Sequence, residues 1–216
     1  MSVRALCQLR DKSQILESVN HHLEKKQYSL SDLCDDEGNT PIHLLCLKFP
    51  IREDVIELFI DIGVDVNAKN KKNETALHSI CKSVNGYIVD VVKLLMKHNI
   101  CLRQKDADGR FAVEVLCRNH VSTSFDELIG LLSVGGLRSR CVLELCSNEN
   151  VMGWRKNIGD SCMSLKKQLL ILEKHGVKFQ REDFYVLEMK EFENEKFENE
   201  KQVYCEIFMR QASQKC

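Results

Sequence analysis

Four short stretches of the chain end in cysteine and carry apolar residues at their first and fourth positions. They are IHLLC at 42–46, LHSIC at 77–81, VEVLC at 113–117 and VLELC at 142–146. In the first two stretches a histidine precedes the cysteine by three residues, and imidazole and thiolate are ligands that zinc prefers. A cysteine beside a histidine is also a usual arrangement for a thiol nucleophile. The pattern therefore raises three hypotheses: a metal site, thiol catalysis, or cysteine that only fills space in a core.

The composition bounds the class of protein before any motif is considered. The chain has 216 residues, with 31 basic and 32 acidic side chains and a formal net charge of −1. That length suits one domain with its own core, and that charge balance argues against binding a nucleic acid or a membrane surface through bulk charge. No apolar stretch approaches the length of a membrane span, and the first residues, MSVRALCQLRDKSQ, do not resemble a signal peptide.

The eleven cysteines are odd in number and widely spaced, and no CxxC motif occurs among them. Without a secretion signal, this usage predicts reduced thiols in a protein of the cytoplasm, the nucleus or both. A free cysteine inside a protein behaves as a small hydrophobic residue.

The cysteine-ending stretches recur with a regular period. Cys46 and Cys81 are 35 positions apart, and Cys81 and Cys117 are 36 apart. The surrounding segments DDEGNTPIHLLC, NKKNETALHSIC and DADGRFAVEVLC share a polar turn, a helix start and an apolar helix face. A second helical pattern follows each one, over 53–63, 89–99 and 125–135. This period predicts helix–loop–helix units joined by extended polar turns.

The first unit carries detailed signals for its helix ends. Thr40 stands at a capping position, and Pro41 stands in the first helical turn, where its missing N–H has no cost. Gly38 can take a positive φ in the preceding turn without a steric penalty. Gly63 is placed to end the second helix of the unit.

Together these residues resemble the ankyrin repeat, whose signature is a T-P-L-H-x-A helix start. GNTPIHLLC followed by VIELFIDIGVDVNAKN carries the resemblance, and ETALHSIC with VVKLLMKHNI repeats it. A third copy departs from the signature, with Phe111 in place of threonine and Glu114 in place of histidine. The clear resemblance covers residues 35–136.

The resemblance implies an all-α ankyrin-repeat solenoid of about 3–5 helix–loop–helix repeats with short β-hairpin-like turns and degenerate terminal repeats. The expected parts are N-terminal capping helices or a degenerate repeat at 1–34, ankyrin repeats at 35–69 and 70–105, a degenerate repeat at 106–136, a degenerate terminal repeat with an inserted loop around Trp154 at 137–180, and a charged C-terminal tail at 181–216. In the tail, KEFENEKFENEK predicts either a solvated helix or a linker. VYCEIFMR at 203–210 could dock on the body or on a partner.

The resemblance also gives the cysteines a structural place, because the family usually has alanine there. The positions concerned are Cys46, Cys81, Cys117 and Cys146. A zinc site would have to join equivalent residues of neighbouring repeats, but stacked helices lie about 8–10 Å apart, whereas zinc–ligand bonds are about 2.0–2.3 Å. In ankyrin-like repeats the histidine instead hydrogen-bonds the neighbouring turn. We therefore expect no metal, no cofactor and no catalytic residue, and we expect His21, His22 and His175 on the surface.

The resemblance further implies that the hairpin tips and the concave face bind a partner. The family's variable positions, carried over by alignment, give a candidate contact surface of Asp36, Glu37, Asn39, Lys48, Lys71, Lys72, Glu74, Lys82, Ala107, Asp108, Arg110 and Arg118. Any one of these could equally be a solvated turn residue. The tips run acidic, then basic, then mixed, which favours a protein partner over a nucleic acid, because a phosphate backbone requires uniform positive charge.

Two functions remain open at this point. The first is a monomeric adaptor or competitive inhibitor that binds another protein and masks its surface; small ankyrin proteins that resemble this chain include cytoplasmic inhibitors of Rel-type transcription factors and host-interaction proteins of viruses and intracellular bacteria. The second is a substrate receptor of a ubiquitin ligase with a C-terminal recruiting segment. The F-box and the SOCS box usually contain proline, and this chain has none after Pro50, so the receptor ranks second. An enzyme ranks third.

Overall fold

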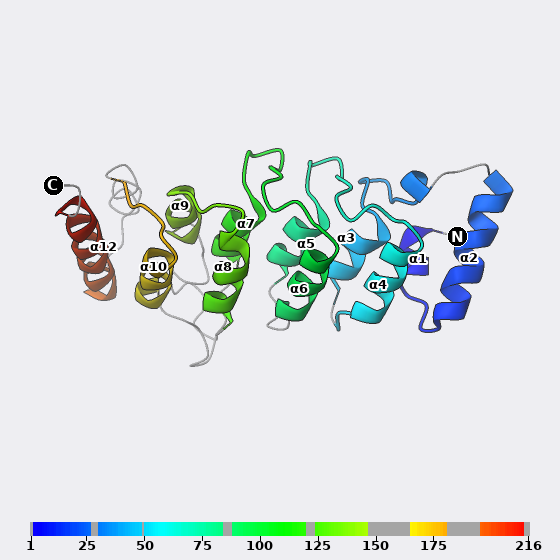
Figure 1. The fold of residues 1–216 in the computed structure, drawn as a ribbon, viewed down its shortest axis with the longest axis horizontal. Helices are drawn as coiled ribbons and strands as arrows, with labels where there is room; N and C mark the ends of the chain where they lie inside the picture. The colour runs from blue at the N-terminus through cyan, green and yellow to red at the C-terminus, as the bar shows by residue number, and fades with distance from the viewer. Residues whose placement is uncertain are drawn as a thin grey trace. The chain divides into compact units, whose positions relative to one another are not determined.

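The computed structural model describes residues 2–26, 30–48, 50–83, 88–119, 124–146, 165–180 and 195–213, and these residues fall into two compact units that divide between Ala112 and Val113. The first unit contains α1 (Val3–Leu6), α2 (Lys12–Lys26), the short 3-10 helix η1 (Leu30–Asp32), α3 (Pro41–Cys46), α4 (Glu53–Asp61), α5 (Ala76–Lys82) and α6 (Val89–Lys97). The second contains α7 (Ala112–Asn119, apart from its first residue), α8 (Phe125–Ser133), α9 (Arg140–Cys146), α10 (Leu165–Lys174) and α12 (Glu195–Ser213) (Figure 1). The expected all-α class is confirmed, since the described residues form helices and no strand.

The first helix of each full repeat begins where the sequence predicts. Thr40 lies in the extended conformation before α3, with Pro41 as the first helical residue. Thr75 does the same before α5. An extended capping residue lets its backbone carbonyl enter the helix while its side chain serves the first turn, so the threonine fixes where each helix starts.

The second helices end slightly earlier than the apolar pattern suggests. The last helical residues of α4 and α6 are Asp61 and Lys97. Gly63 follows α4 with a φ of 98°, and Asn99 takes the equivalent place after α6 with a φ of 60°. A residue with positive φ just past a helix lets the chain turn back and satisfy the last carbonyls. Asparagine tolerates this conformation better than other residues with a side chain, which is why the second copy dispenses with glycine.

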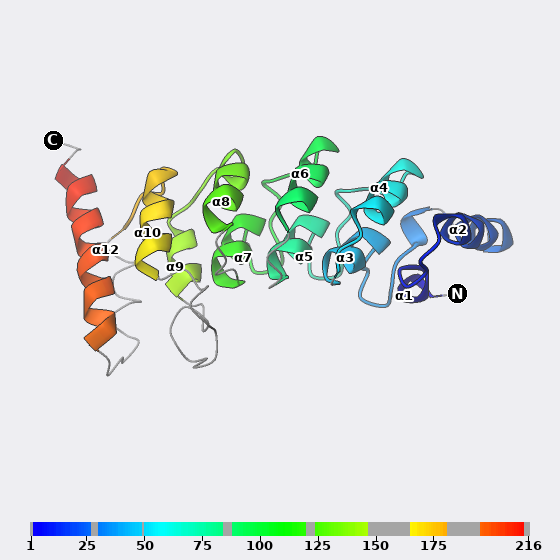
Figure 2. The ribbon, with the colours of Figure 1, turned by 90° about the horizontal axis from the view of Figure 1, so that it is seen from below.

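Helices of the first unit form two rows. In Figure 2, α1, α3 and α5 lie in one row, with α4 and α6 in a second row beside it. Between the rows lie fully buried apolar side chains, among them Ile42, Ile56, Phe59, Ile80 and Leu95. Full burial of one such side chain contributes about 1.5–3 kcal/mol, so the apolar face of each helix is what holds the rows together.

The second unit is organised around α10, which contacts α8, α9 and α12. α12 buries Val203, Tyr204 and Ile207, and the Tyr204 hydroxyl donates a hydrogen bond to the carbonyl of Gln180 at 2.6 Å. The side chain of Gln211 bonds the chain that follows α10 twice, donating to the Val177 carbonyl and accepting from the Phe179 amide. Of the two possibilities for 203–210, the structure thus shows docking within its own unit, as part of one helix that already begins at residue 195.

The link between α8 and α9 is short. It spans only 134–139, whereas the links before α5 and α7 span 62–75 and 98–111 and contain the extended hairpins. The inserted loop at 147–164, with Trp154, lies outside the described residues, as do the first three residues of the first FENEK copy, 192–194. The proposed boundaries between repeats stay predictions.

The cysteines of the first two repeats are core residues. Cys46 and Cys81 are 0 % exposed, and Cys117 of the third stretch is buried as well. Burial raises the pKa of the Cys46 thiol to about 12 and raises that of Cys81 further, because a thiolate there would lose its hydration. The reactive form of cysteine is the thiolate, so these thiols are unsuited to nucleophilic chemistry. The side chain of Cys146 is outside the described residues.

Thiol labelling should separate the buried cysteines from the exposed ones. Brief treatment of the native protein with iodoacetamide at pH 8 should modify Cys34 and Cys101, which are exposed, and leave Cys46 and Cys81 unmodified. Peptide mass spectrometry would read each site, and a sample unfolded in guanidinium chloride provides the fully labelled reference. Labelling of Cys46 at the rate of Cys34 in the folded protein would contradict the assignment of Cys46 to the core.

Candidate functional site

The three hairpin tips of the first unit share one backbone turn. The amide of Asp35 donates to the carbonyl of Asn39 at 3.0 Å, Asn70 donates to Glu74 at 3.0 Å, and Asp106 donates to Arg110 at 2.9 Å. Each turn closes with a residue of positive φ, which is Gly38, Asn73 or Gly109. At Gly38 a side chain would also meet the next hairpin, because a Cβ there would lie 3.2 Å from the backbone nitrogen of Lys71. The sequence prediction of a positive φ at Gly38 is confirmed.

A side-chain oxygen at the first position of each turn holds the loop in shape. Oδ1 of Asp35 accepts hydrogen bonds from the amides of Glu37 and Asn39 at 3.0 and 2.9 Å. Oδ1 of Asn70 does the same for Lys72 and Glu74 at 2.9 and 3.0 Å. Aspartate and asparagine are the residues whose short side chains can bond their own backbone two residues on, so the turns are set locally by the sequence.

The tips are also bonded to one another. The amide of Lys71 donates to the carbonyl of Glu37 at 2.9 Å, and the amide of Ala107 donates to the carbonyl of Lys72 at 2.8 Å. We call the exposed tip residues Asp36, Glu37, Lys71, Lys72, Ala107 and Asp108 the hairpin row. Because backbone bonds connect each tip to the next, the hairpin row is a fixed array of side chains and not three independent loops.

Two buried histidines connect each first helix to the following hairpin. In the first copy, Nδ1 of His43 lies 2.8 Å from the Thr40 hydroxyl and 3.3 Å from the Thr40 amide, while Nε2 lies 2.9 Å from the carbonyl of Glu74. His78 makes the same contacts with Thr75 and with the carbonyl of Arg110, at 3.2 Å for the last. The amide is a donor and the carbonyl an acceptor, so the ring must be neutral with its proton on Nε2. Burial lowers the pKa of both histidines, which favours that neutral form.

The structure places the sequence-predicted contact residues in three environments. Asp36, Glu37, Lys71, Lys72, Ala107, Asp108 and Arg118 are exposed; Lys48, Lys82 and Arg110 are half-buried; Asn39 and Glu74 are buried. All of them except Arg118 belong to the first unit. Only the exposed tip residues come together as one array.

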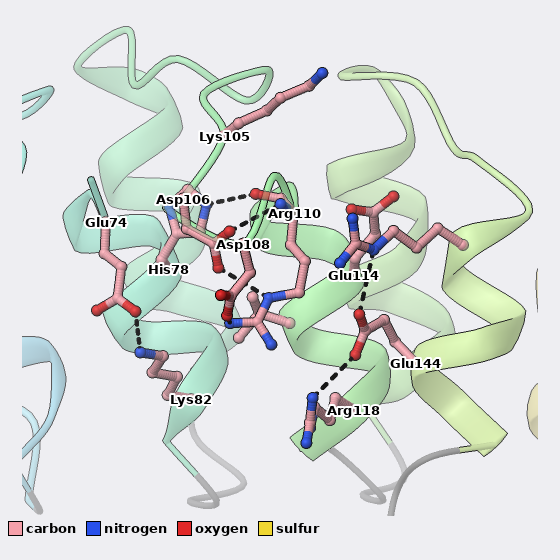
Figure 3. A network of polar contacts seen from close by, with 12 residues as sticks. Glu74, His78, Lys82, Lys105, Asp106, Asp108, Arg110, Glu114, Arg118 and Glu144 are labelled. Carbon is pink, nitrogen blue, oxygen red and sulfur yellow. Dashed lines mark hydrogen bonds and ion pairs between the residues drawn. The ribbon is translucent and has the colours of Figure 1, made fainter. Parts of the chain in front are cut away.

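Asn39 and Glu74 are occupied inside the protein. The side-chain amide of Asn70 donates to Oδ1 of Asn39 at 2.9 Å and to Oε2 of Glu74 at 3.1 Å, and the Glu74 carboxylate pairs with Lys82 (Figure 3). Burial alone would raise the pKa of Glu74, but the hydrogen bonds from Lys82 and Asn70 outweigh it and keep that pKa below its ordinary value. The family resemblance marks these positions as variable, yet here Asn39 links two hairpins, and Glu74 connects its own turn to Lys82 on α5.

Arg110 is likewise engaged within its own turn. Its Nε lies 2.9 Å from Asp106, and its Nη2 lies 2.6 Å from Asp108 (Figure 3). Burial alone would raise the pKa of Asp106, but the hydrogen bonds from Arg110 hold that pKa below its ordinary value. Changing Arg110 would therefore disturb the turn itself, which makes it a poor probe of partner binding.

Sequence reasoning missed the contact that replaces histidine in the third copy. Glu114 is fully buried, and its carboxylate accepts a two-pronged hydrogen bond from Arg138, with Nε at 2.7 Å and Nη2 at 2.5 Å. The link 134–139 has no extended hairpin, so it offers no equivalent of the carbonyl that His43 and His78 bond. An acceptor on α7 and a donor in the short link provide the contact instead. The sequence signals that could have predicted this contact are the replacement of histidine by Glu114 in the third copy and the missing hairpin after it.

The sequence pattern predicted His175 as a surface residue, but its side chain is mostly buried and bonded to another helix. It follows α10, its side chain is 20 % exposed, and Nε2 lies 2.7 Å from Oδ1 of Asp126 on α8. Gly130 leaves room for the ring, since a Cβ there would lie 3.2 Å from the ring carbon Cε1. Hydrogen bonds from Lys174 and His175 lower the pKa of Asp126. His21 on α2 is exposed, as expected.

The arrangement offers a surface on which another molecule can be recognised. Within the described ranges, no three histidine, cysteine or acidic side chains gather closely enough to hold a metal ion. The described helices also include none with the length and apolar character needed to cross a bilayer. What the first unit offers is a rigid, exposed row of charged tips on a tightly bonded frame.

Comparison with known proteins identifies the repeat. The family described as "Ankyrin repeats (3 copies)" matches residues 7–106. A stress-activated protein kinase alpha of Dictyostelium discoideum is 44 % identical over 68 residues, covering 31 % of this chain and 10 % of the kinase. A protein named as an ankyrin repeat protein of fowlpox virus is 44 % identical over 45 residues, covering 21 % and 8 %. A protein named as a serine/threonine-protein kinase of Dictyostelium discoideum is 27 % identical over 168 residues, covering 72 % and 19 %. The chain thus spans less than a fifth of each of these relatives.

The buried histidines predict a loss of stability in mild acid. Their pKa in the folded protein lies below the ordinary 6.5, so the unfolded chain binds protons first. Stability should be complete above pH 6.5 and fall as the pH drops below it, by at most about 1.4 kcal/mol per pH unit for each histidine. Hydrogen exchange of the peptides at 41–46 and 76–82, followed from pH 7.5 to 5.5, would measure this after correction for the intrinsic exchange rate. In the variant H43Q/H78Q the pH dependence should be smaller; an unchanged dependence would show that other groups cause it.

The Glu114–Arg138 pair predicts a strong effect of removing one partner. Arg138→Gln leaves the buried Glu114 carboxylate without its bidentate donor and should cost about 2–3 kcal/mol of unfolding free energy in the second unit. Urea unfolding with exchange of the α7 peptide as the readout would measure it. The matched control is Lys174→Gln, which removes a cation from an exposed pair with Asp126 in the same unit and should change stability by less than about 0.5 kcal/mol. Equal effects of the two substitutions would show that the Glu114–Arg138 contact contributes little.

Proposed function

Over residues 7–106 the chain belongs to the ankyrin-repeat family, whose members bind other proteins, and on that premise we propose that it is an adaptor or competitive inhibitor that binds a partner protein through the hairpin row. The family is an interaction domain and not an enzymatic one. A competitive inhibitor needs only to bind a surface that another molecule requires. The function therefore needs no reactive group, only a rigid surface of the right charge and shape.

The observation that carries this proposal is that backbone hydrogen bonds connect each hairpin tip to the next. The backbone hydrogen bonds at Lys71 and Ala107 hold neighbouring tips in a fixed relation, so little conformational freedom is lost when a partner binds. Loops that were independently mobile would have to be ordered on binding, at a cost in affinity. A preorganised row of exposed side chains is what a binding surface requires.

The charges of the hairpin row favour a protein partner. Asp36 and Glu37 make the first tip acidic, Lys71 and Lys72 make the second basic, and Asp108 adds an acidic group to the third. In the described part of the chain, neither Lys71 nor Lys72 has an acidic side chain within 4 Å. Alternating charge steers and orients a protein with the complementary pattern, whereas a phosphate backbone would be repelled by the acidic tips.

The alternative of a ubiquitin-ligase receptor receives less support from the tail. A recruiting segment would have to offer apolar side chains to another protein. α12 instead buries Val203, Tyr204 and Ile207 within the second unit. This use of the tail favours the adaptor or inhibitor.

Charge reversal at the second tip tests the proposal. In affinity capture from cell lysate, K71E/K72E should lose at least about nine-tenths of the partner retained by the parent chain, since both side chains are exposed and change sign. Because Arg110 supports its own turn, it is left unchanged.

The matched control is K12E/K97E, which makes the same change of net charge on α2 and α6, outside the hairpins. Circular dichroism would verify that both variants fold. Retention of the partner by K71E/K72E at the parent level, or equal loss in the control, would rule out the hairpin row as the contact surface.

A further inference from the structure

In the described part of the second unit, two carboxylates are almost entirely removed from solvent. The side chain of Glu114 on α7 is 0 % exposed, and that of Glu144 on α9 is 9 % exposed. A buried carboxylate is costly unless cations and hydrogen bonds compensate it. Here the compensation comes from three arginines, Arg118, Arg138 and Arg140, which we call the arginine face.

Sequence spacing and fold bring the arginine face together. Arg118 follows Glu114 by four residues on α7, and Arg140 precedes Glu144 by four residues on α9, so each pair lies on one side of its helix. Arg118 of α7 lies 3.5 Å from Glu144 of α9, and Figure 3 shows the two side chains turned toward each other. Arg140 lies 3.3 Å from the same carboxylate, and Arg138 holds Glu114. Two carboxylates therefore orient three guanidinium groups.

The negative and positive groups of this cluster lie at different depths from the surface. The carboxylates are buried, but the side chains of Arg118, Arg138 and Arg140 are 50 %, 35 % and 36 % exposed. An approaching molecule can reach the guanidinium groups and cannot reach the carboxylates. Seen from solvent, the patch is therefore positive, although its formal charge is only +1.

The contacts with Glu144 leave donors on two of the arginines. Arg118 uses Nη1 and Arg140 uses Nε, and in the described part of the second unit neither has another acidic side chain within 4 Å. A guanidinium group carries five N–H donors in a planar fork that matches the two oxygens of a carboxylate. Held by Glu144, these forks lose less freedom on binding than unrestrained surface arginines would.

We propose that the arginine face binds an acidic segment of a partner protein, through aspartate or glutamate carboxylates that bridge Arg118 and Arg140. The proposal rests on the proposed function, since it takes a protein as the ligand, and it adds a second contact surface outside the hairpin row. Charge complementarity selects this occupant: a short acidic segment supplies carboxylates for the remaining donors of Arg118 and Arg140. A nucleic acid would need a longer run of cations than this patch supplies.

The test is a titration of the full chain with a blocked tetraglutamate peptide, followed by NMR of the arginine Nε–Hε groups. The signals of Arg118 and Arg140 should shift saturably, and tetraglutamine at the same concentrations should leave them unchanged. In the variants, which lack these two signals, the dissociation constant is followed by the backbone amide shifts of α7 and α9. It should rise about tenfold in R118Q/R140Q and about threefold in R118K/R140K, which keeps the charge but loses the fork. Added salt should weaken the binding.

R118K/R140K also guards against a folding defect, because the buried Glu144 keeps two cations beside it. The Nε–Hε signal of Arg138 reports in each variant whether the Glu114 contact persists. No saturable shift, an equal response to tetraglutamine, equal affinity in both variants and the parent, or binding of a phosphoserine peptide alone would each overturn the proposal. The titration does not depend on captured partners, so its failure is distinguishable from failure of the hairpin row.

Discussion

A neutral imidazole, placed between a helix start and the next hairpin, is the interaction on which the first unit depends. Nδ1 of His43 accepts a hydrogen bond from the Thr40 amide, and Nε2 donates one to the Glu74 carbonyl. It therefore fixes the first turn of α3 and, at the same time, the position of the following tip. The order of the hairpin row is a consequence of this contact together with the backbone bonds between tips.

The second unit shows what happens when the acceptor of that contact is missing. The link 134–139 contains no extended hairpin. The contact between an imidazole ring and a backbone carbonyl is therefore replaced by an ion pair between two side chains, Glu114 and Arg138. Burying one carboxylate requires cations nearby, and the same requirement recurs at Glu144. The positive patch that results is a by-product of the way the helices are joined, available for recognition.

Sequence alone predicted the helix starts and the turns, because these depend on local residues such as Thr40, Pro41 and Gly38. It also predicted the buried places of Cys46, Cys81 and Cys117, which follow from the repeat. It predicted the hairpin tips as a set, but not that Asn39 and Glu74 are buried. Asn39 meets its partner Asn70 only when two repeats stack, and Glu74 is held by Asn70 of its own turn and by Lys82 of α5. The Glu114–Arg138 contact joins residues 24 positions apart across a link of atypical length, and no repeat pattern encodes such a pair. The helix at 195–213 unites two segments whose charge and apolar patterns differ, so its continuity was not evident.

The two kinds of junction also differ in how readily repeats can be added to or removed from the array. The histidine contact asks only for a backbone carbonyl, which any repeat with a hairpin supplies, whatever its side chains. Repeats joined in this way can be duplicated, deleted or exchanged without a matching change elsewhere. The contact between Glu114 and Arg138 requires two particular side chains, so neither can be replaced alone. The chain thus combines repeats that can vary in number with one junction that requires two specific side chains.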